Sequence, residues 1–375
     1  MRVANAKHLI ADILFRPHDI SQPHLCDAKS EREITMQPTA VSSAVSSDNL
    51  EIPLIDFSAY LEGDAATKRS TAQAILHGFQ KAGFIYLTNH GIPKEQVQGA
   101  FAQSAKFFAR PAEQKMELGW TTPRANRGYS QPGREKTTDA TDPAEIEKIR
   151  AAEGADMKES FEIGREGDEG CPNQWPDRFG DAEGKEFKAF MLDFFDVVKQ
   201  LHVRVMQAIA VGLDIEESWF DSYTDRGDNN LRLLHYPAVS SEVFRANKNT
   251  VRAGAHTDYG SITCLFQDMR GGLQVLSPNG NYIDATPIED SIVVNAGDLL
   301  ARWSNDTIKS TKHRVVEPPS AAAVHPARYS IAYFCNPNFD RLIEAIPSTY
   351  GPDRPKKYAG VSSGGYLEQR LSATY

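Results

Sequence analysis

The feature that most constrains the fold is a run of short strand-like segments in the second half of the chain. After Asn229 the hydrophobic pattern changes from helical spacing to short apolar segments, and turn residues punctuate it at Asn279-Gly280, Gly297-Asp298 and Pro318-Pro319. The segments expected to be strands are 231–236, 251–256, 261–267, 272–276, 281–285, 291–294, 299–303, 310–316 and 328–334. Many short strands with close turns are typical of a sandwich or barrel of the jelly-roll type.

Helices are expected mainly before this run. Apolar residues recur at three- and four-residue spacing in residues 66–82, 94–118 and 187–213, and the last of these segments has the strongest helical pattern in the chain. Two short apolar segments, 52–57 and 83–87, are expected to be strands. The pattern therefore predicts a mainly β protein with flanking helices.

Composition excludes several classes of function. The 375 residues carry a net charge of −9, which argues against a general nucleic-acid binder, since such proteins gather Lys and Arg on one face. No apolar run approaches the roughly 20 residues that a membrane helix needs. No pair of cysteines is spaced as CxxC, which favours a reducing compartment over a disulfide framework or a zinc finger; the four are Cys26, Cys171, Cys264 and Cys335. We therefore expect a cytoplasmic protein.

Two stretches are open to more than one interpretation. The first 50 residues are expected to be a flexible extension, although Arg2, Lys7 and Arg16 among apolar residues also fit a mitochondrial transit peptide, against which Asp12 argues. The polar stretch 128–170 is interpreted as a solvated loop with a short surface helix; the alternative is a mobile lid over a substrate site.

His256, Asp258 and His313 are the candidate metal ligands. If residues 253–258 are extended, His256 and Asp258 project from the same face of a strand, and His313 follows 55 residues after Asp258 in another strand-like segment. Two imidazoles and one carboxylate on one side of a metal are typical of non-haem iron(II) oxygenases. The HxD pair alone also fits an ordinary polar pair at a strand end. His90, in the turn Asn89-His90-Gly91, is interpreted as a local hydrogen-bonding residue.

Arg328 and Ser330 form a candidate anion site. They occupy alternate positions of the expected strand 328–334 and therefore share one of its faces. An arginine fork beside a hydroxyl suits a carboxylate, through paired charge-assisted hydrogen bonds.

With these motifs in place, the sequence resembles the isopenicillin N synthase-like group of iron(II)/2-oxoglutarate-dependent dioxygenases. The resemblance covers about residues 51–345. Its motifs are Ile-Pro-Leu-Ile-Asp-Phe at 52–57, Gly-Phe-Ile-Tyr-Leu-Thr-Asn-His-Gly at 83–91, Leu-Arg-Leu-Leu-His-Tyr-Pro at 231–237, the HxD pair, the distal histidine and Arg-x-Ser. The segments 254–261 and 295–306 look especially like the fungal thymine (pyrimidine) dioxygenase branch, and related sequences act in fungal secondary metabolism.

The resemblance implies a double-stranded β-helix (jelly roll) with outer helices. It implies iron(II) on His256, Asp258 and His313, and the distal carboxylate of 2-oxoglutarate on Arg328 and Ser330. The implied regions are an extension (1–50), an N-terminal dioxygenase region (51–180), a helix with the catalytic jelly roll (181–345) and a tail or helix (346–375). The implied reaction uses oxygen, forms succinate and carbon dioxide, and oxidises a small molecule. A family oxidase that does not use 2-oxoglutarate, or a non-catalytic ligand-binding jelly roll, remains an alternative; nothing in the sequence indicates an oligomeric state.

Substrate-contacting residues are expected from the same resemblance. On an extended strand, Arg232, Leu234 and Tyr236 share one face. The resemblance implies that Tyr236 approaches 2-oxoglutarate and that Arg232 contacts the substrate; a structural ion pair and a core tyrosine are the alternatives. It also implies that Asn229, Tyr259 and Phe334 line the substrate pocket, where amide and guanidinium groups pair with a polar ring edge and aromatic groups stack on its face. Plain core packing is the alternative for Phe334.

Overall fold

A large mixed sheet carries most of the strands. The computed structural model describes residues 42–122, 125–134, 157–246, 252–317 and 322–374, all of which belong to one compact unit, Ala40–Tyr375. The sheet has nine strands, and only β2 and β3 pair in parallel. Their order is β1 (Ser42–Ser47), β2 (Leu50–Asp56), β3 (Phe84–Thr88), β12 (Ile292–Ala296), β9 (Ile262–Gln267), β15 (Arg328–Cys335), β6 (Asn230–Tyr236), β5 (Glu159–Gly164) and β4 (Gly128–Ser130).

A second sheet of four strands carries two of the candidate ligands. Its order is β11 (Tyr282–Asp284), β10 (Leu273–Leu276), β13 (His313–Val315) and β8 (Ala253–His256). Two-stranded pairs join β14 (Val324–His325) to β7 (Val239–Ser240) and β16 (Leu342–Ile343) to β17 (Val361–Ser362).

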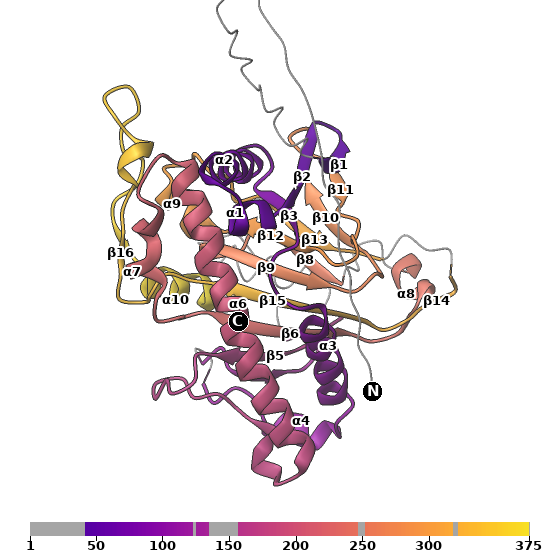
Figure 1. The fold of residues 1–375 in the computed structure, drawn as a ribbon. Coiled ribbons are helices and arrows are strands. Elements are labelled where there is room, and N and C mark those ends of the chain that lie inside the picture. Colours follow the sequence, from indigo (N-terminus) through magenta and orange to yellow (C-terminus); the bar gives the residue numbers. More distant parts are fainter. Residues whose placement is uncertain (1–41, 123–124, 135–156, 247–251, 318–321, 375) are drawn as a thin grey trace, which may run out of the picture. The chain divides into compact units, whose positions relative to one another are not determined.

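The longest helix, α6 (Ala182–Gly212), runs across one face of the large sheet, with α2 (Ala65–Lys81) and α3 (Lys94–Phe108) beside it (Figure 1). The Asp181 carboxylate caps the first turn of α6 by accepting from the Gly184 amide at 2.5 Å. The other α-helices are α1 (Ser58–Glu62), α4 (Ala112–Glu117), α7 (Asp221–Thr224), α8 (Ser241–Ala246), α9 (Asp298–Trp303) and α10 (Ser363–Thr374), with 3₁₀ turns at Pro176–Phe179, Glu217–Phe220 and Pro347–Thr349. None of the helices in the described part of the chain is long and apolar enough to cross a membrane.

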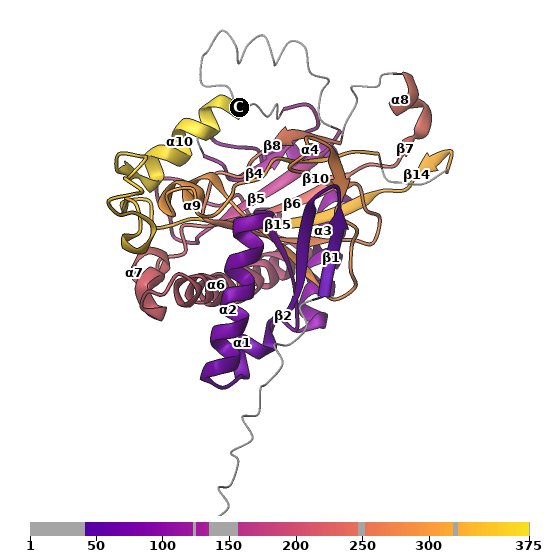
Figure 2. The same cartoon turned by 90° about the horizontal axis from the view of Figure 1, so that it is seen from above.

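The large sheet has a different core on each face. Leu231, Leu233, Ile331 and Tyr333 belong to the apolar cluster shared with the helices. Their strand neighbours Leu234, Tyr236 and Ala332 belong to a second cluster shared with the four-stranded sheet. Viewed from above, α2 and α6 lie on one side of β15 and β8 lies on the other (Figure 2). The period-two alternation of a strand therefore separates a helix-covered face from a face that turns toward the second sheet.

The structure confirms the prediction of a mainly β protein with flanking helices and corrects it in three places. Strand β1 lies inside the stretch expected to be an extension and pairs with β2. Strands β4 and β5 lie inside the stretch expected to be a solvated loop, and every residue of β5 is buried; residues 135–156 of that stretch lie outside the described residues. The expected strand 299–303 is helix α9. The expected regions 51–180 and 181–345 both contribute strands to the large sheet.

Candidate active site

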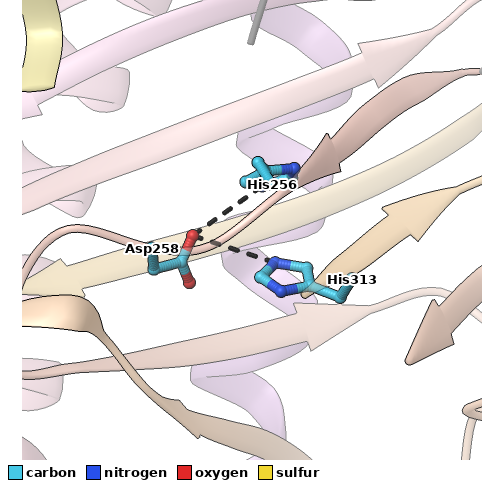
Figure 3. A group of neighbouring side chains, drawn as sticks. All are labelled: His256, Asp258 and His313. Carbon is cyan, nitrogen blue, oxygen red and sulfur yellow. Dashed lines mark ion pairs between the residues drawn. The ribbon is translucent and has the colours of Figure 1, made fainter. Parts of the chain in front are cut away.

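His256, Asp258 and His313 come together at the edge of the four-stranded sheet. His313 begins β13 and is the ladder partner of His256, which ends β8. Nε2 of each histidine lies 3.8 Å from Oδ1 of Asp258, and the two imidazole centroids are 4.4 Å apart. Figure 3 shows both rings directed at the carboxylate. Ligand atoms from all three residues lie within 4.8 Å of one another, which is a suitable spacing for one metal ion.

Hydrogen bonds orient all three side chains. Nδ1 of His256 lies 2.8 Å from the Gly254 carbonyl oxygen and Nδ1 of His313 lies 3.2 Å from that of Thr311, so each ring donates from Nδ1 and keeps the Nε2 lone pair free. Oδ2 of Asp258 accepts from Thr263 at 2.6 Å and from Asn295 at 2.7 Å. Oδ1 is therefore the carboxylate oxygen left facing the histidines.

The charge state of the cluster also suits a cation. Burial raises the pKa of the Asp258 carboxyl, but the charges of His313 and His256 and two hydrogen bonds outweigh it, so this pKa lies below its ordinary value. Burial, followed by the charge of His256, lowers the pKa of His313 to about 4. At neutral pH, Asp258 is an anion and His313 is a neutral imidazole, which are the protonation states of metal ligands.

Arg328 and Ser330 line the same cavity as the three candidate ligands, as does Tyr236; its volume is about 70 Å³. The Arg328 guanidinium is fully buried and donates from Nε to the Gly271 carbonyl oxygen at 3.0 Å and from Nη1 to the Ser330 hydroxyl at 3.2 Å. Tyr236 is the ladder partner of Arg328, whose Cζ lies 4.9 Å from the centre of the phenol ring. The structure thus brings the expected carboxylate-binding residues to the expected metal site.

Arg232 and Phe334 also line this cavity. Nε of Arg232 lies 2.6 Å from Oε1 of the fully buried Glu162, and its Cζ lies 5.1 Å from the centre of the Phe334 ring. Glu162 accepts a further hydrogen bond from Asn230 at 2.6 Å. The structural ion pair and the place in the cavity wall, which were alternatives for Arg232, are therefore compatible, because the same side chain has both.

Asn229 and Tyr259 are not among the residues that line the cavity beside the candidate ligands, and their expected contact with the substrate stays a prediction. The Asn229 amide donates to the Tyr333 hydroxyl at 3.0 Å, and its oxygen accepts from the Asn336 amide at 2.9 Å. The Tyr259 ring lies 4.7 Å from Cζ of Arg370 on α10. Asn229 instead borders a second cavity.

His90 bonds locally, as expected for a turn residue. Its Nδ1 accepts from the Ile92 amide at 3.3 Å. This histidine is not among the residues that line the cavity of the candidate ligands.

The second cavity, of about 400 Å³, lies farther along the same face of the sheet. Asn230 and Asn336 line it, and each is two residues from a side chain that lines the first cavity, Arg232 and Phe334 respectively. Asn230 and Phe334 are also ladder partners. Helix α10 contributes Leu367 and Leu371 to its wall. The two cavities therefore adjoin along β6 and β15.

Sequence reasoning missed Glu162, Thr263 and Asn295. Glu162 lies in a short strand whose period-two signal is limited to Phe161 and Ile163, inside a polar stretch. Thr263 and Asn295 hold Asp258 through side-chain hydrogen bonds, which only the pairing of β9 with β12 makes possible.

Comparison with known proteins agrees with this geometry. Residues 52–178 match the family described as non-haem dioxygenase in morphine synthesis N-terminal, and residues 227–337 match the 2OG-Fe(II) oxygenase superfamily. The chain is 34% identical over 326 residues to the 2-oxoglutarate-Fe(II) type oxidoreductase ppzD of Metarhizium rileyi, spanning 86% of this chain and 90% of that protein. It is also 34% identical to the proline hydroxylase buaE of Petromyces alliaceus, spanning 87% and 100%.

Among solved structures, the chain resembles the full-length thymine-7-hydroxylase of Neurospora crassa in complex with alpha-KG (2-oxoglutarate) and thymine. The sequence identity is 65%, the TM-score is 0.82, and the match spans 89% of this chain and 100% of that one.

Proposed function

This chain belongs to the 2OG-Fe(II) oxygenase superfamily, and on that basis we propose that the cavity around His256, Asp258 and His313 is its oxidation site. The protein is an oxidoreductase of the dioxygenase type that uses iron(II), 2-oxoglutarate and oxygen. One observation carries the proposal for these residues: three metal-ligand side chains and the Arg328–Ser330 pair open onto one cavity.

In the proposed site, Nε2 of His256, Nε2 of His313 and Oδ1 of Asp258 hold iron(II). Three protein ligands on one side leave the other side open for small molecules. Thr263 and Asn295 fix the Asp258 carboxylate, so that the ligand set needs little rearrangement when the metal binds.

Arg328 and Ser330 hold the distal carboxylate of 2-oxoglutarate, with Tyr236 beside them. The guanidinium is preoriented by the Gly271 carbonyl and the Ser330 hydroxyl, and its burial strengthens its attraction for an anion. Iron(II) held at the proposed site would supply the oxidation: one atom of O2 would enter succinate as 2-oxoglutarate loses carbon dioxide, and the other would oxidise a C–H bond of the substrate. The surrounding apolar side chains exclude water from that reaction.

We infer that the two sheets form a double-stranded β-helix, the jelly-roll core expected from the sequence. The second apolar cluster, which both sheets share, supports this inference, as does the ladder that brings His256 beside His313.

The substrate is a small, neutral, ring-shaped molecule, and a pyrimidine-like base is favoured over a secondary metabolite. Arg232 offers donors to a polar ring edge, and Phe334 offers a face for stacking. The 65% identity to a protein solved with thymine bound supports this choice. Because the similar fungal proteins include a proline hydroxylase, the substrate screen also covers fungal metabolites that are not pyrimidines.

The decisive experiment has two stages. Anaerobic addition of iron(II) and 2-oxoglutarate is expected to give a visible charge-transfer band, and a His256→Ala protein that gives the same band would contradict the metal site. Thymine, uracil derivatives and fungal aromatic metabolites are then screened for succinate release coupled to product. Product without succinate would indicate the oxidase that does not use 2-oxoglutarate, and no turnover of any compound by the iron-loaded protein would indicate a ligand-binding jelly roll.

A further inference from the structure

Arg252 is a buried arginine whose guanidinium has no hydrogen-bond partner among the described residues. It precedes β8 and is 1% exposed. In the part of the chain that the structure describes, each of its three guanidinium nitrogens is unpartnered. Its backbone amide donates to the Val315 carbonyl oxygen at 2.8 Å, which ties this residue to the strand that begins with His313.

The guanidinium of Arg252 lies behind the cavity wall, near Tyr236, and is not itself among the residues that line the cavity. Its Cζ is 5.7 Å from the centre of the Tyr236 ring, and Cζ of Arg328 is 4.9 Å from the centre of the same ring. Two fully buried arginines therefore share one tyrosine, which itself lines the cavity.

The acids near Arg252 have other partners. Both carboxylate oxygens of Asp268 accept hydrogen bonds from backbone amides, those of Tyr329 at 2.8 Å and Arg270 at 3.0 Å. The Glu317 carboxylate lies 2.6 Å from Nε2 of His325. Across the described ranges of the chain, no carboxylate forms an ion pair with Arg252 or Arg328, so direct contact with these acids does not balance the positive charge of the two guanidinium groups.

Two buried guanidinium groups near one tyrosine, with no carboxylate paired to either among the described residues, are unfavourable without an anion. Burial, and after it the charge of Arg328, lowers the pKa of Arg252. Unpartnered guanidinium donors also lose the hydrogen bonds that water would give them. A ligand that brings negative charge close to the two guanidinium groups offsets their mutual repulsion.

We propose that Arg252 is a specificity-determining residue for the cosubstrate: it is the second cation that attracts the distal carboxylate, so the site selects a dicarboxylic 2-oxo acid over a monocarboxylic one. This inference rests on the proposed role of Arg328 and Ser330. Because the charge of Arg328 acts on Arg252 through the fold, a carboxylate held by Arg328 is attracted by Arg252 as well, without direct contact.

The test compares two ligands that differ only at the distal end. 2-Oxoglutarate and 2-oxobutanoate chelate a metal through the same 2-oxo acid group, but only the former has a distal carboxylate. Each is titrated anaerobically into the iron(II)-loaded full-length protein, and the charge-transfer band reports binding without turnover. For Arg252→Gln, we expect the dissociation constant of 2-oxoglutarate to rise by about tenfold or more and that of 2-oxobutanoate to change by less than about twofold.

An equal change for both ligands, or none for 2-oxoglutarate, would overturn the inference. The matched control is Arg341→Gln, because Arg341 also lies over a tyrosine ring, that of Tyr223 at 5.5 Å, but is half-buried and does not line the cavity. It is expected to bind both ligands as the unmodified protein does.

Two further outcomes keep the test decisive. If circular dichroism shows that Arg252→Gln does not fold, Arg252→Lys replaces it, because lysine keeps the positive charge but not the planar guanidinium. A smaller loss of affinity that is confined to 2-oxoglutarate supports the inference. An equal loss of affinity for both ligands overturns it. If the unmodified protein binds neither ligand, the proposed iron and carboxylate sites fail, and the inference fails with them.

Discussion

His256 and His313 face each other as ladder partners on two antiparallel strands that lie far apart in the sequence. Their imidazole centroids are 4.4 Å apart, and a register irregularity in the ladder follows directly, between His313 and Val315. Both histidines lie 3.8 Å from the Asp258 carboxylate, which follows the end of β8 and is outside this ladder. Because Asp258 lies outside the ladder, its position depends on Thr263 and Asn295, which donate hydrogen bonds to its carboxylate.

Asn295→Ala is expected to weaken iron(II) binding by about 10- to 100-fold, because it removes a hydrogen bond that fixes Oδ2 of Asp258. Metal content after dialysis against graded chelator concentrations measures the effect. Asn281→Ala is the control, since that amide bonds to Asp48 at 3.0 Å and lies away from the cavity. Equal metal retention by the two variants would contradict the assigned role.

Glu162→Gln is expected to lower the free energy of unfolding by about 3 kcal/mol, because it removes the buried anion that Arg232 contacts. The KM for the substrate should rise, whereas 2-oxoglutarate binding should not change. Denaturant unfolding and steady-state kinetics measure the two effects. The exposed Arg69–Asp214 pair supplies the control: Asp214→Asn is expected to cost less than about 1 kcal/mol. A Glu162→Gln protein with unchanged KM would remove Arg232 from the substrate site.

We expect a substrate held by Arg232 and Phe334 to extend into the adjoining second cavity, whose wall includes Leu367. Leu367→Trp places a larger side chain there and is expected to raise the substrate KM by about tenfold. The affinity for 2-oxoglutarate should stay the same, since Arg328 and Ser330 line the other cavity. Leu342→Trp, at an exposed leucine of β16, is the control. An unchanged KM in Leu367→Trp would show that the substrate does not use this cavity.

Asp181→Asn is expected to destabilise the protein by about 1 kcal/mol at neutral pH, a modest cost because solvent screens the partly exposed carboxylate. The hydrogen bonds from Arg110, at 2.8 and 2.9 Å, lower the pKa of Asp181 to about 2. A lowered pKa stabilises the fold above the ordinary carboxyl pKa of 3.8, and this contribution is lost as the pH falls toward 2.

The difference in melting temperature between the unmodified protein and Asp181→Asn should therefore shrink between about pH 4 and pH 2. Asn still caps a helix, so the variant tests the ion pair and not the cap. Asp64→Asn is the comparison: Asp64 caps α2 through the Thr67 amide at 2.8 Å, which lowers its pKa as well, but no ion pair involves it among the described residues, so its difference should shrink less. A melting-temperature difference that stays constant between pH 4 and pH 2 would contradict the stabilising role of the Arg110–Asp181 ion pair.

Periodicity was sufficient to predict the elements that have one buried face. Helix α6 carries a regular apolar stripe, and β6 and β15 have the expected bounds to within one residue. Periodicity was insufficient where polar residues are buried in pairs: Glu159 and Glu162 made β5 resemble a loop, although Lys115 and Arg232 balance their charges inside the fold. It also failed for α9, an apolar run too short to distinguish a helix from a strand.

The sequence predicted the part of the candidate site whose residue types suggest a definite ligand: histidine and aspartate for a metal, and arginine with serine for a carboxylate. The three candidate metal ligands and the Arg328–Ser330 pair lie at one cavity, although the role of each stays a prediction. The surroundings of Asn229 and Tyr259, which are the second cavity and Arg370 of α10, could not be read from their sequence neighbours, and their contact with the substrate stays a prediction. Arg252 illustrates the same limit, because only the folded chain reveals that its guanidinium has no partner among the described residues.

The two-faced character of β6 and β15 has a practical consequence for engineering. Positions 231, 233, 331 and 333 pack against the helices, whereas positions 232, 234, 332 and 334 line the cavity. A saturation library restricted to the second set should sample new substrate preferences while leaving the helix-packed core intact. A library on the first set would mostly return proteins that fail to accumulate.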